Sequence, residues 1–304
     1  MLRLIIRKIG QGVLMIVVVS AITFALLSVA GGDALTALRD NPQISEKTIE
    51  QLREVYGLDK PMLSRFGTWA QSALRGDLGE SMALRVPVTT LVCSRFLNTL
   101  LMGLIALILS IVVSLVLAVW STQAQNKWLD RIVELLIFLT ASTPRMVLAL
   151  LALLLSLSLV SAANYLFQLT AGAIVLAVPL ISILLAQLKN GLDEVMSEDY
   201  IRTARAKGLS EWSVIAKHAL RPSLSPFLTI AGLSLGGLLG GSVIVESVLG
   251  WQGIGALVVS AVRGRDVPVV MGVVLISSAA VWFGNALAEV LQFANDARIR
   301  TGEK

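Results

Sequence analysis

The chain has 304 residues, of which 56% are hydrophobic and 15% charged, with a formal net charge of +5. An average soluble domain is about a quarter charged, so this composition argues against a soluble protein and for a membrane protein. In a membrane protein, an excess of basic residues indicates which loops face the cytoplasm, and we prefer this interpretation to a nucleic-acid-binding surface. The single cysteine, Cys93, excludes an internal disulfide and a cysteine-based metal cluster.

Six apolar runs are long enough to cross a bilayer, which takes about 20 helical residues because backbone groups cannot stay unpaired in lipid. We predict an all-α membrane protein with six spans, approximately Ile9 to Ala30, Leu100 to Trp120, Ile132 to Leu159, Thr170 to Leu188, Pro226 to Val248 and Met271 to Phe293. The first run exceeds the length of a signal-peptide core, so we expect it to remain as a span.

Basic residues gather in four segments, 3–8, 127–131, 189–221 and 298–304. Six spans place all four on one side, which the positive-inside rule makes cytoplasmic. We therefore expect a multi-pass membrane protein with both termini in the cytoplasm.

The chain divides into a first transmembrane helix (1–30), an external helical segment (31–98) and a five-helix core (99–304) with a cytoplasmic loop at 189–225. In the external segment we predict a helix capped by Ser45, a left-handed residue at Gly57 and a second helix ending at Gly76. The partly apolar loop 250–270 could dip into the membrane, and Asp266 is expected to order that loop.

The stretch EDYIRTARAKGLSEWSVIAKHALRP, residues 198–222, is polar between two apolar runs. Gly208 predicts the end of one short helix, Ser210 can cap a second, and Pro222 is expected to stop it. Three small residues beside this corner would let another protein approach closely: Thr203, Ala204 and Ala206. The pattern alone leaves equally open a solvated hairpin without a partner.

Several segments follow one another along nearly the whole chain: LRLIIRKIGQGVLMIVVVSAITFALL, GGDA, YGLDKPMLSRFGTWAQSALRGDLGES, NKWLDRIVELL, RTARAKGL, KHALR, GGLLGGSVIVESVLGWQGIG, RDVPVV and DARIR. In this order they resemble the permeases of binding-protein-dependent ABC importers, in the dipeptide, oligopeptide and nickel branch. The resemblance implies the type I importer permease fold and a subunit that moves small peptides, nickel or metal chelates.

The resemblance also implies partners: a homologous second permease, two cytoplasmic ATPase subunits and an extracytoplasmic binding protein. The polar stretch matches the EAA-type loop that docks on the ATPase, with the coupling residues Arg202, Thr203, Ala204, Arg205, Ala206, Lys207 and Gly208. The chain has no GxxxxGK[ST] phosphate loop, so we expect no cofactor in it and ATP-Mg in the partner subunits.

A charge inside a span costs about 2.5 to 3.5 kcal/mol and usually faces a cavity or a partner. The candidate translocation-path residues are therefore Arg145 and Glu246, with small residues of the fifth span: Gly236, Gly237, Gly240 and Gly241. Arg145 could instead pair with Glu134 or a partner subunit, and Glu246 could lie at the interface or pair with Arg263 or Arg265. His218, the sole histidine, lies in no metal-ligand cluster, so no metal site is expected.

A stand-alone channel or ion-coupled transporter is the alternative function. This alternative has less support, because a loop that couples to an ATPase has no role in a protein that works without one. A membrane-embedded hydrolase would need a Ser/His pair, paired intramembrane Asp residues or zinc ligands, and the sequence shows none of these arrangements. We therefore expect no catalytic residues and no enzyme activity in this chain.

Overall fold

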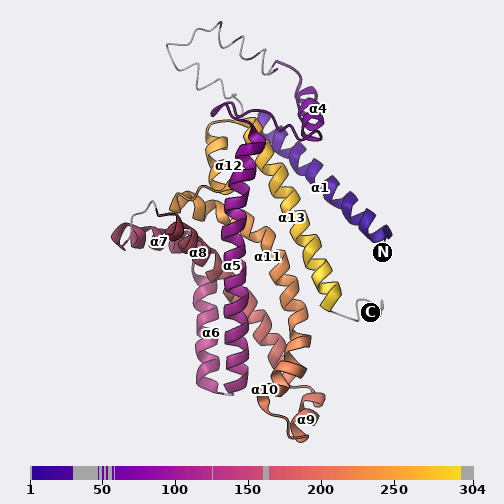
Figure 1. Ribbon diagram of the computed structural model, residues 1–304, viewed down its shortest axis with the longest axis vertical. Helices are drawn as coiled ribbons and strands as arrows, with labels where there is room; N and C mark the ends of the chain where they lie inside the picture. Colours follow the sequence, from indigo (N-terminus) through magenta and orange to yellow (C-terminus); the bar gives the residue numbers. More distant parts are fainter. Residues whose placement is uncertain are drawn as a thin grey trace. The chain divides into compact units, whose positions relative to one another are not determined.

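A computed structural model describes residues 2–29, 47, 50, 53, 57, 59–124, 126–159 and 164–295 (Figure 1). Every regular element within these residues is a helix, which confirms the predicted all-α class. In chain order the elements are α1 (Leu2–Val29), α4 (Met62–Ala73), α5 (Val88–Ala124), α6 (Lys127–Ser142), α7 (Arg145–Leu159), α8 (Tyr165–Met196), α9 (Asp199–Ala206), α10 (Glu211–Val214), the π-helical turn η1 (Ile215–Ala219), α11 (Leu220–Leu249), α12 (Ile254–Arg263) and α13 (Val267–Asn295). The helix predicted after Ser45 falls largely outside the described residues.

Five of these helices or continuous helical segments are long and apolar enough to cross a membrane; they contain α1, α5, α8, α11 and α13. The third predicted span, 132–159, is not one straight helix, because α6 and α7 meet at a bend of 91°. The pair makes a sixth span only if the two bent segments cross the bilayer together.

The bend between α6 and α7 lies at Thr143 and Pro144. Thr143 has an extended backbone with φ −88° and ψ 116°, since a proline disfavours helical backbone in the residue before it. The Pro144 carbonyl then accepts the N–H groups of Val147 (3.0 Å) and Leu148 (3.3 Å), so the same proline opens α7. Arg145 therefore lies at the corner of a broken span and not in the middle of a continuous one.

One compact unit comprises residues 1–99 and 252–282. Gly76 follows α4 with φ +81° and ends this segment as predicted. Asp266 does more than order its own loop: its buried carboxylate accepts hydrogen bonds from the Ser81 hydroxyl (2.6 Å) and the Ala83 N–H (3.2 Å). This carboxylate ties the segment before α5 to the start of α13.

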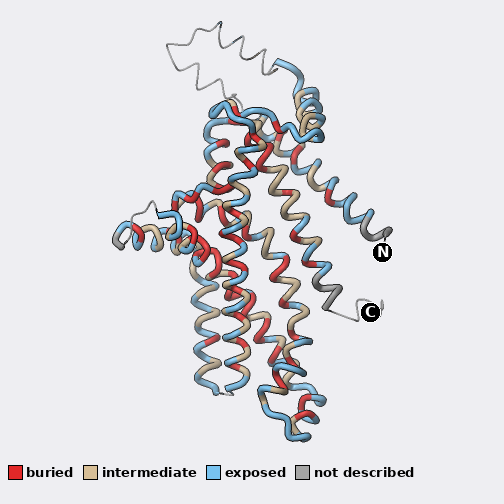
Figure 2. The backbone as a smooth tube through the Cα atoms, viewed as in Figure 1, coloured by how far each residue is buried: buried red, intermediate tan, exposed pale blue. Residues whose placement is uncertain are grey.

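The second compact unit comprises residues 100–251 and 283–304. Its centre is α8, which is the most buried of the candidate spans (Figure 2). On α5, the hydroxyls of Ser110 and Ser114 donate to the α8 carbonyls of Ala177 (3.2 Å) and Ile181 (3.4 Å). Small hydroxyl side chains let two apolar helices approach closely while their polar atoms stay paired. α5 and α8 are therefore joined along a buried polar seam.

Pro222 does not stop a helix, contrary to the prediction. The chain passes from α10 through η1 directly into α11, and Pro222 lies in the first turn of α11. The change of hydrogen-bond register at the π turn makes residues 220–222 a new helical start, where a proline without an N–H is tolerated. The second part of the polar stretch, from Glu211 onward, therefore continues into the fifth span without a break.

Candidate functional site

The polar stretch forms two helical segments joined at a glycine, which we call the helical corner (residues 198–219). α9 ends at Ala206, and Gly208 follows with φ +79°, a backbone conformation that glycine adopts without strain. The Ser210 hydroxyl accepts the Ser213 N–H at 3.4 Å and caps α10. The structure thus confirms the predicted helix, glycine and capped second helix.

An ion pair fixes the angle between the two segments of the corner. The Arg205 guanidinium donates twice to the Glu211 carboxylate, from Nε at 2.8 Å and from Nη2 at 3.3 Å. A two-pronged contact of this kind restricts orientation as well as distance. Arg202, in contrast, forms its ion pair with the exposed Asp199, at 3.3 Å.

The inner face of the corner belongs to the core of the second unit. Ile201 and Ala204 lie one helical turn apart on α9, and both are in the same buried cluster as Leu188 and Leu192 of α8. Ala204 therefore packs inward. This differs from the prediction, in which Ala204 offered open surface to a partner. The corner is anchored to the spans on both sides.

The outer face of the corner is open. It contains most of the predicted coupling residues, namely Arg202, Thr203, Ala206, Lys207 and Gly208, whereas Arg205 is half-buried in its ion pair. A Cβ added to Gly208 would meet no atom within 4 Å. The outer surface therefore has room for the close approach of another protein.

The predicted path residues Arg145 and Gly241 lie together in the second unit. The half-buried guanidinium of Arg145 rests on Gly241, and a Cβ added to that glycine would lie only 3.0 Å from the guanidinium carbon. Among the described residues, the Arg145 side chain has no ion pair or hydrogen bond, and Glu134 does not pair with it. A cation at the bend of a broken span is thus held against a glycine of α11.

The remaining path candidates differ in exposure. Glu246 is fully buried, so it does not lie at an open interface. Gly236 is half-buried, while Gly237 and Gly240 are exposed, and a Cβ added to either of these two would meet nothing within 4 Å. α11 therefore presents a strip without side chains beside its contact with Arg145.

His218 lies exposed in η1. Within the described ranges, no three side chains of histidine, cysteine, aspartate or glutamate are grouped so that they could hold a metal ion.

Comparison with known proteins shows which family the chain belongs to. Residues 110–301 match the family described as the inner membrane component of binding-protein-dependent transport systems, and residues 1–115 match the N-terminal part of such components. The chain belongs to this family of permeases. It is a transmembrane transport subunit of an ABC transporter and not an enzyme.

Two relatives align with the permease over almost its full length. The oligopeptide transport system permease protein AppB of Bacillus subtilis is 33% identical, covering 97% of this chain and 98% of its own length. The glutathione transport system permease protein GsiC of Escherichia coli is 32% identical, covering 99% of both chains. A crystal structure of an amino acid ABC transporter matches 68% of the permease with a TM-score of 0.56 at 18% identity, which supports the shared fold.

Sequence reasoning missed three features of the permease's helical corner. Large apolar side chains lie exposed on it: Tyr200 at 46%, Leu209 at 41% and Trp212 at 56%. An aromatic residue in an otherwise polar loop was the available signal, because aromatic residues are enriched where proteins contact one another.

Proposed function

We propose that this permease imports small peptides in an ATP-driven system and that separate ATPase subunits dock on its helical corner. The observation that carries the proposal is the corner itself, which has an apolar inner face packed on the spans and an outer face with exposed aromatic and small residues. A surface of this kind suits a shape-matched protein partner. ATP and Mg²⁺ would be bound by the ATPase subunits, with no cofactor in this chain.

The corner is built to transmit motion. It is continuous with α8 at one end, where the Glu198 N–H donates to the Val195 carbonyl (3.1 Å), and it runs through η1 into α11 at the other. When two ATPase subunits close on ATP, a rigid corner would carry that movement to both helices. The ATPase and the permease would then favour the same global state.

We propose six crossings, with both termini in the cytoplasm of a bacterium and the protein in its inner membrane. The end of α5, the start of α6 and the end of α8 lie together, because Asp130 on α6 contacts both Ser121 and Lys189. The bent pair α6 and α7 must then carry the chain to the opposite side before α8 begins. This topology puts the basic segments 127–131 and 189–221 on one side, in keeping with the positive-inside rule.

A homologous second permease would complete the translocation path, and an extracytoplasmic binding protein would deliver the substrate. The exposed Gly237 and Gly240 of α11 suit close contact with a helix of the second permease. Arg145 lies beside Gly241 and has no ion pair within the part of the chain that the structure describes, so it would attract the carboxylate of a peptide entering the path. Small peptides are favoured over nickel chelates because the named relatives transport oligopeptides and glutathione.

Co-purification and uptake test this function. The permease is expressed with candidate ATPase, second-permease and binding-protein subunits from the same organism, and the complex is reconstituted in liposomes. We expect the ATPase subunits to co-purify and labelled dipeptides or tripeptides to enter only with ATP. Uptake without any ATPase would instead favour the stand-alone channel or ion-coupled transporter, and uptake of a nickel chelate but of no peptide would overturn the substrate class.

A further inference from the structure

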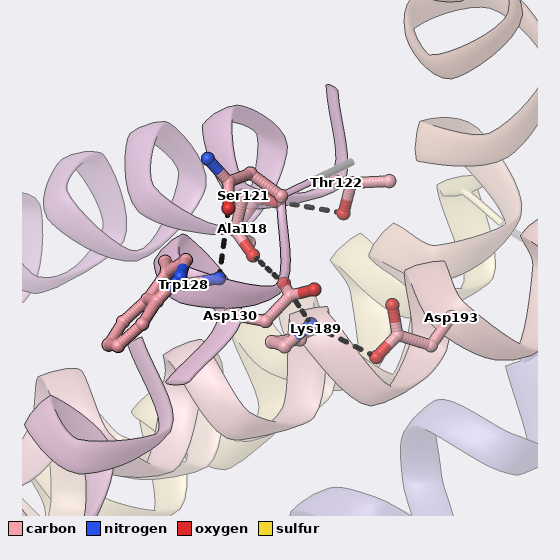
Figure 3. Close-up of polar contacts among 8 residues, drawn as sticks. Ala118, Ser121, Thr122, Trp128, Asp130, Lys189 and Asp193 are labelled. Carbon is pink, nitrogen blue, oxygen red and sulfur yellow. Dashed lines mark hydrogen bonds and ion pairs between the residues drawn. The ribbon is translucent and has the colours of Figure 1, made fainter. Parts of the chain in front are cut away.

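A charged cluster lies where α5, α6 and α8 meet, outside the helical corner (Figure 3). One carboxylate oxygen, Oδ1 of Asp130 on α6, accepts hydrogen bonds from the Ser121 hydroxyl of α5 at 2.5 Å and from the Lys189 ammonium of α8 at 3.0 Å. Lys189 also contacts Asp193, one turn further along α8, at 3.2 Å. A single oxygen atom thus joins the consecutive helices α5 and α6, nine residues apart at this contact, to α8, which lies 59 residues further along the chain.

We propose that Ser121, Asp130 and Lys189 form a three-helix latch that carries the movement of the helical corner into α5 and α6. The proposal rests on the proposed ATPase docking and assigns a positioning role to residues that do not touch substrate or ATPase.

The burial of Lys189 makes the contact with Asp130 more than a surface ion pair. The Lys189 side chain is only 9% exposed, whereas exposed pairs contribute little and form without fixing their neighbours. A buried cation needs compensating carboxylates, which Asp130 and Asp193 supply together, and the Asp130 contact is the one that reaches another helix. The helix that carries Lys189 is therefore held against the helix that carries Asp130.

The two carboxylates around Lys189 have different mechanical consequences. Asp193 lies on the same helix as Lys189, so its contact cannot connect α8 to anything else. Asp130 lies 59 residues away in sequence, on α6, and its contact is the one that crosses between helices. Of these two contacts, only the one with Asp130 can transmit a displacement of α8 to another helix.

The latch lies close to the helical corner along the chain. α8 ends at Met196 and α9 begins at Asp199, and the residues between them stay hydrogen-bonded to the last turn of α8. On another side, Gly191 packs on Ser223 of α11, where an added Cβ would lie 3.3 Å from the Ser223 Cβ. The end of α8 is thus fixed to α11 through close packing and to α5 and α6 through the latch.

A matched pair of variants separates a latch from a general need for charge. Asp130→Ala and Asp193→Ala each remove one carboxylate from Lys189, but only the first breaks the connection between helices. In complexes reconstituted with all subunits, we measure the number of ATP molecules hydrolysed per peptide imported. Couplings between sites are commonly about 5- to 150-fold, so we expect Asp130→Ala to raise this ratio at least about fivefold. Asp193→Ala should leave it near the wild-type value.

A purely structural role would lower the amount of assembled complex and leave the ratio unchanged. An unchanged ratio in assembled Asp130→Ala complexes, or an equal rise in Asp193→Ala, overturns the latch. If Asp130→Ala does not assemble, Ser121→Ala decides, since it keeps every charge and removes one hydrogen bond from α5; a rise of about twofold or more is expected, and no rise overturns the proposal. A wild-type complex without bound ATPase would instead refute the proposed function.

Discussion

The helical corner and the three-helix latch are both charged, yet the two clusters are built in opposite ways. In the corner, Arg205 and Glu211 are six residues apart and partly exposed, and the outer face is left open. In the latch, Asp130 and Lys189 are 59 residues apart and the cation is buried. The two carboxylates are similarly exposed, Glu211 at 35% and Asp130 at 37%, so the difference lies in the cations. The partly exposed Arg205 leaves surface free for a partner, whereas the buried Lys189 holds the chain's own helices together.

Gly208→Val should have the largest effect on transport. Valine at φ +79° is strained by about 1 to 3 kcal/mol, although the added side chain would meet no neighbour within 4 Å of its Cβ. We expect peptide uptake to fall at least about tenfold while the protein stays folded in the membrane. Gly208→Asn is the control, since asparagine tolerates this conformation and should retain most of the uptake. Normal uptake by Gly208→Val would show that the corner's shape is not needed.

A pair of glycine variants on α11 extends the contrast between buried and open positions. A Cβ added to Gly232 would lie 2.8 Å from the Ala288 Cα of α13, so Gly232→Leu should destabilise the subunit by about 1 to 3 kcal/mol. Gly237→Leu adds its side chain to open space and should leave the melting temperature of the isolated subunit unchanged. It should instead weaken association with the second permease, measured by pull-down. Equal loss of thermal stability in both variants would contradict the packing described for α11.

Arg205→Gln should have a smaller effect. The ion pair with Glu211 is about a third exposed, so its loss should cost at most about 1 kcal/mol of local stability. We expect uptake to fall severalfold because the angle of the corner is no longer fixed. Arg205→Lys keeps the charge but loses the two-pronged contact, so it should restore uptake only in part. Complete rescue by lysine would mean that charge alone matters.

Arg202→Ala should have the smallest effect on stability. Arg202 and Asp199 are both largely exposed, so the thermal melting temperature should not change measurably. Binding of the ATPase subunits, measured by titration, should still weaken, because Arg202 lies on the open face. A stability loss without weaker binding would place Arg202 among the residues that hold the fold.

The sequence predicted those features that depend on local chemistry. Long apolar runs located five spanning helices, and Gly208 and Ser210 located the corner, because left-handed backbone and helix capping need particular residue types. The latch could not be predicted, since nothing local indicates that Asp130 faces Lys189. Pro144 was visible in the sequence, but the 91° bend depends on how α7 packs against α8 and α11.

Two predictions failed because the local sequence does not show how distant helices pack. Pro222 is a strong helix-stopping signal, yet a π-helical turn before it lets the helix continue into α11. Ala204 suggested an open surface because alanine is small, but its position one turn from Ile201 puts it on the buried face. In both cases the packing of distant helices, and not the local sequence, decided the outcome.

Crosslinking from the open face of the corner tests the central claim most directly. In a Cys93→Ser background, Thr203→Cys is placed on the corner and Ser64→Cys on α4 as the control, and each is treated with a thiol-to-amine crosslinker in membranes containing all subunits. We predict that the Thr203→Cys permease crosslinks to an ATPase subunit, that ATP changes the yield, and that the Ser64→Cys permease gives no such product. Absence of the ATPase product from Thr203→Cys, or its equal formation from Ser64→Cys, would contradict docking at the helical corner.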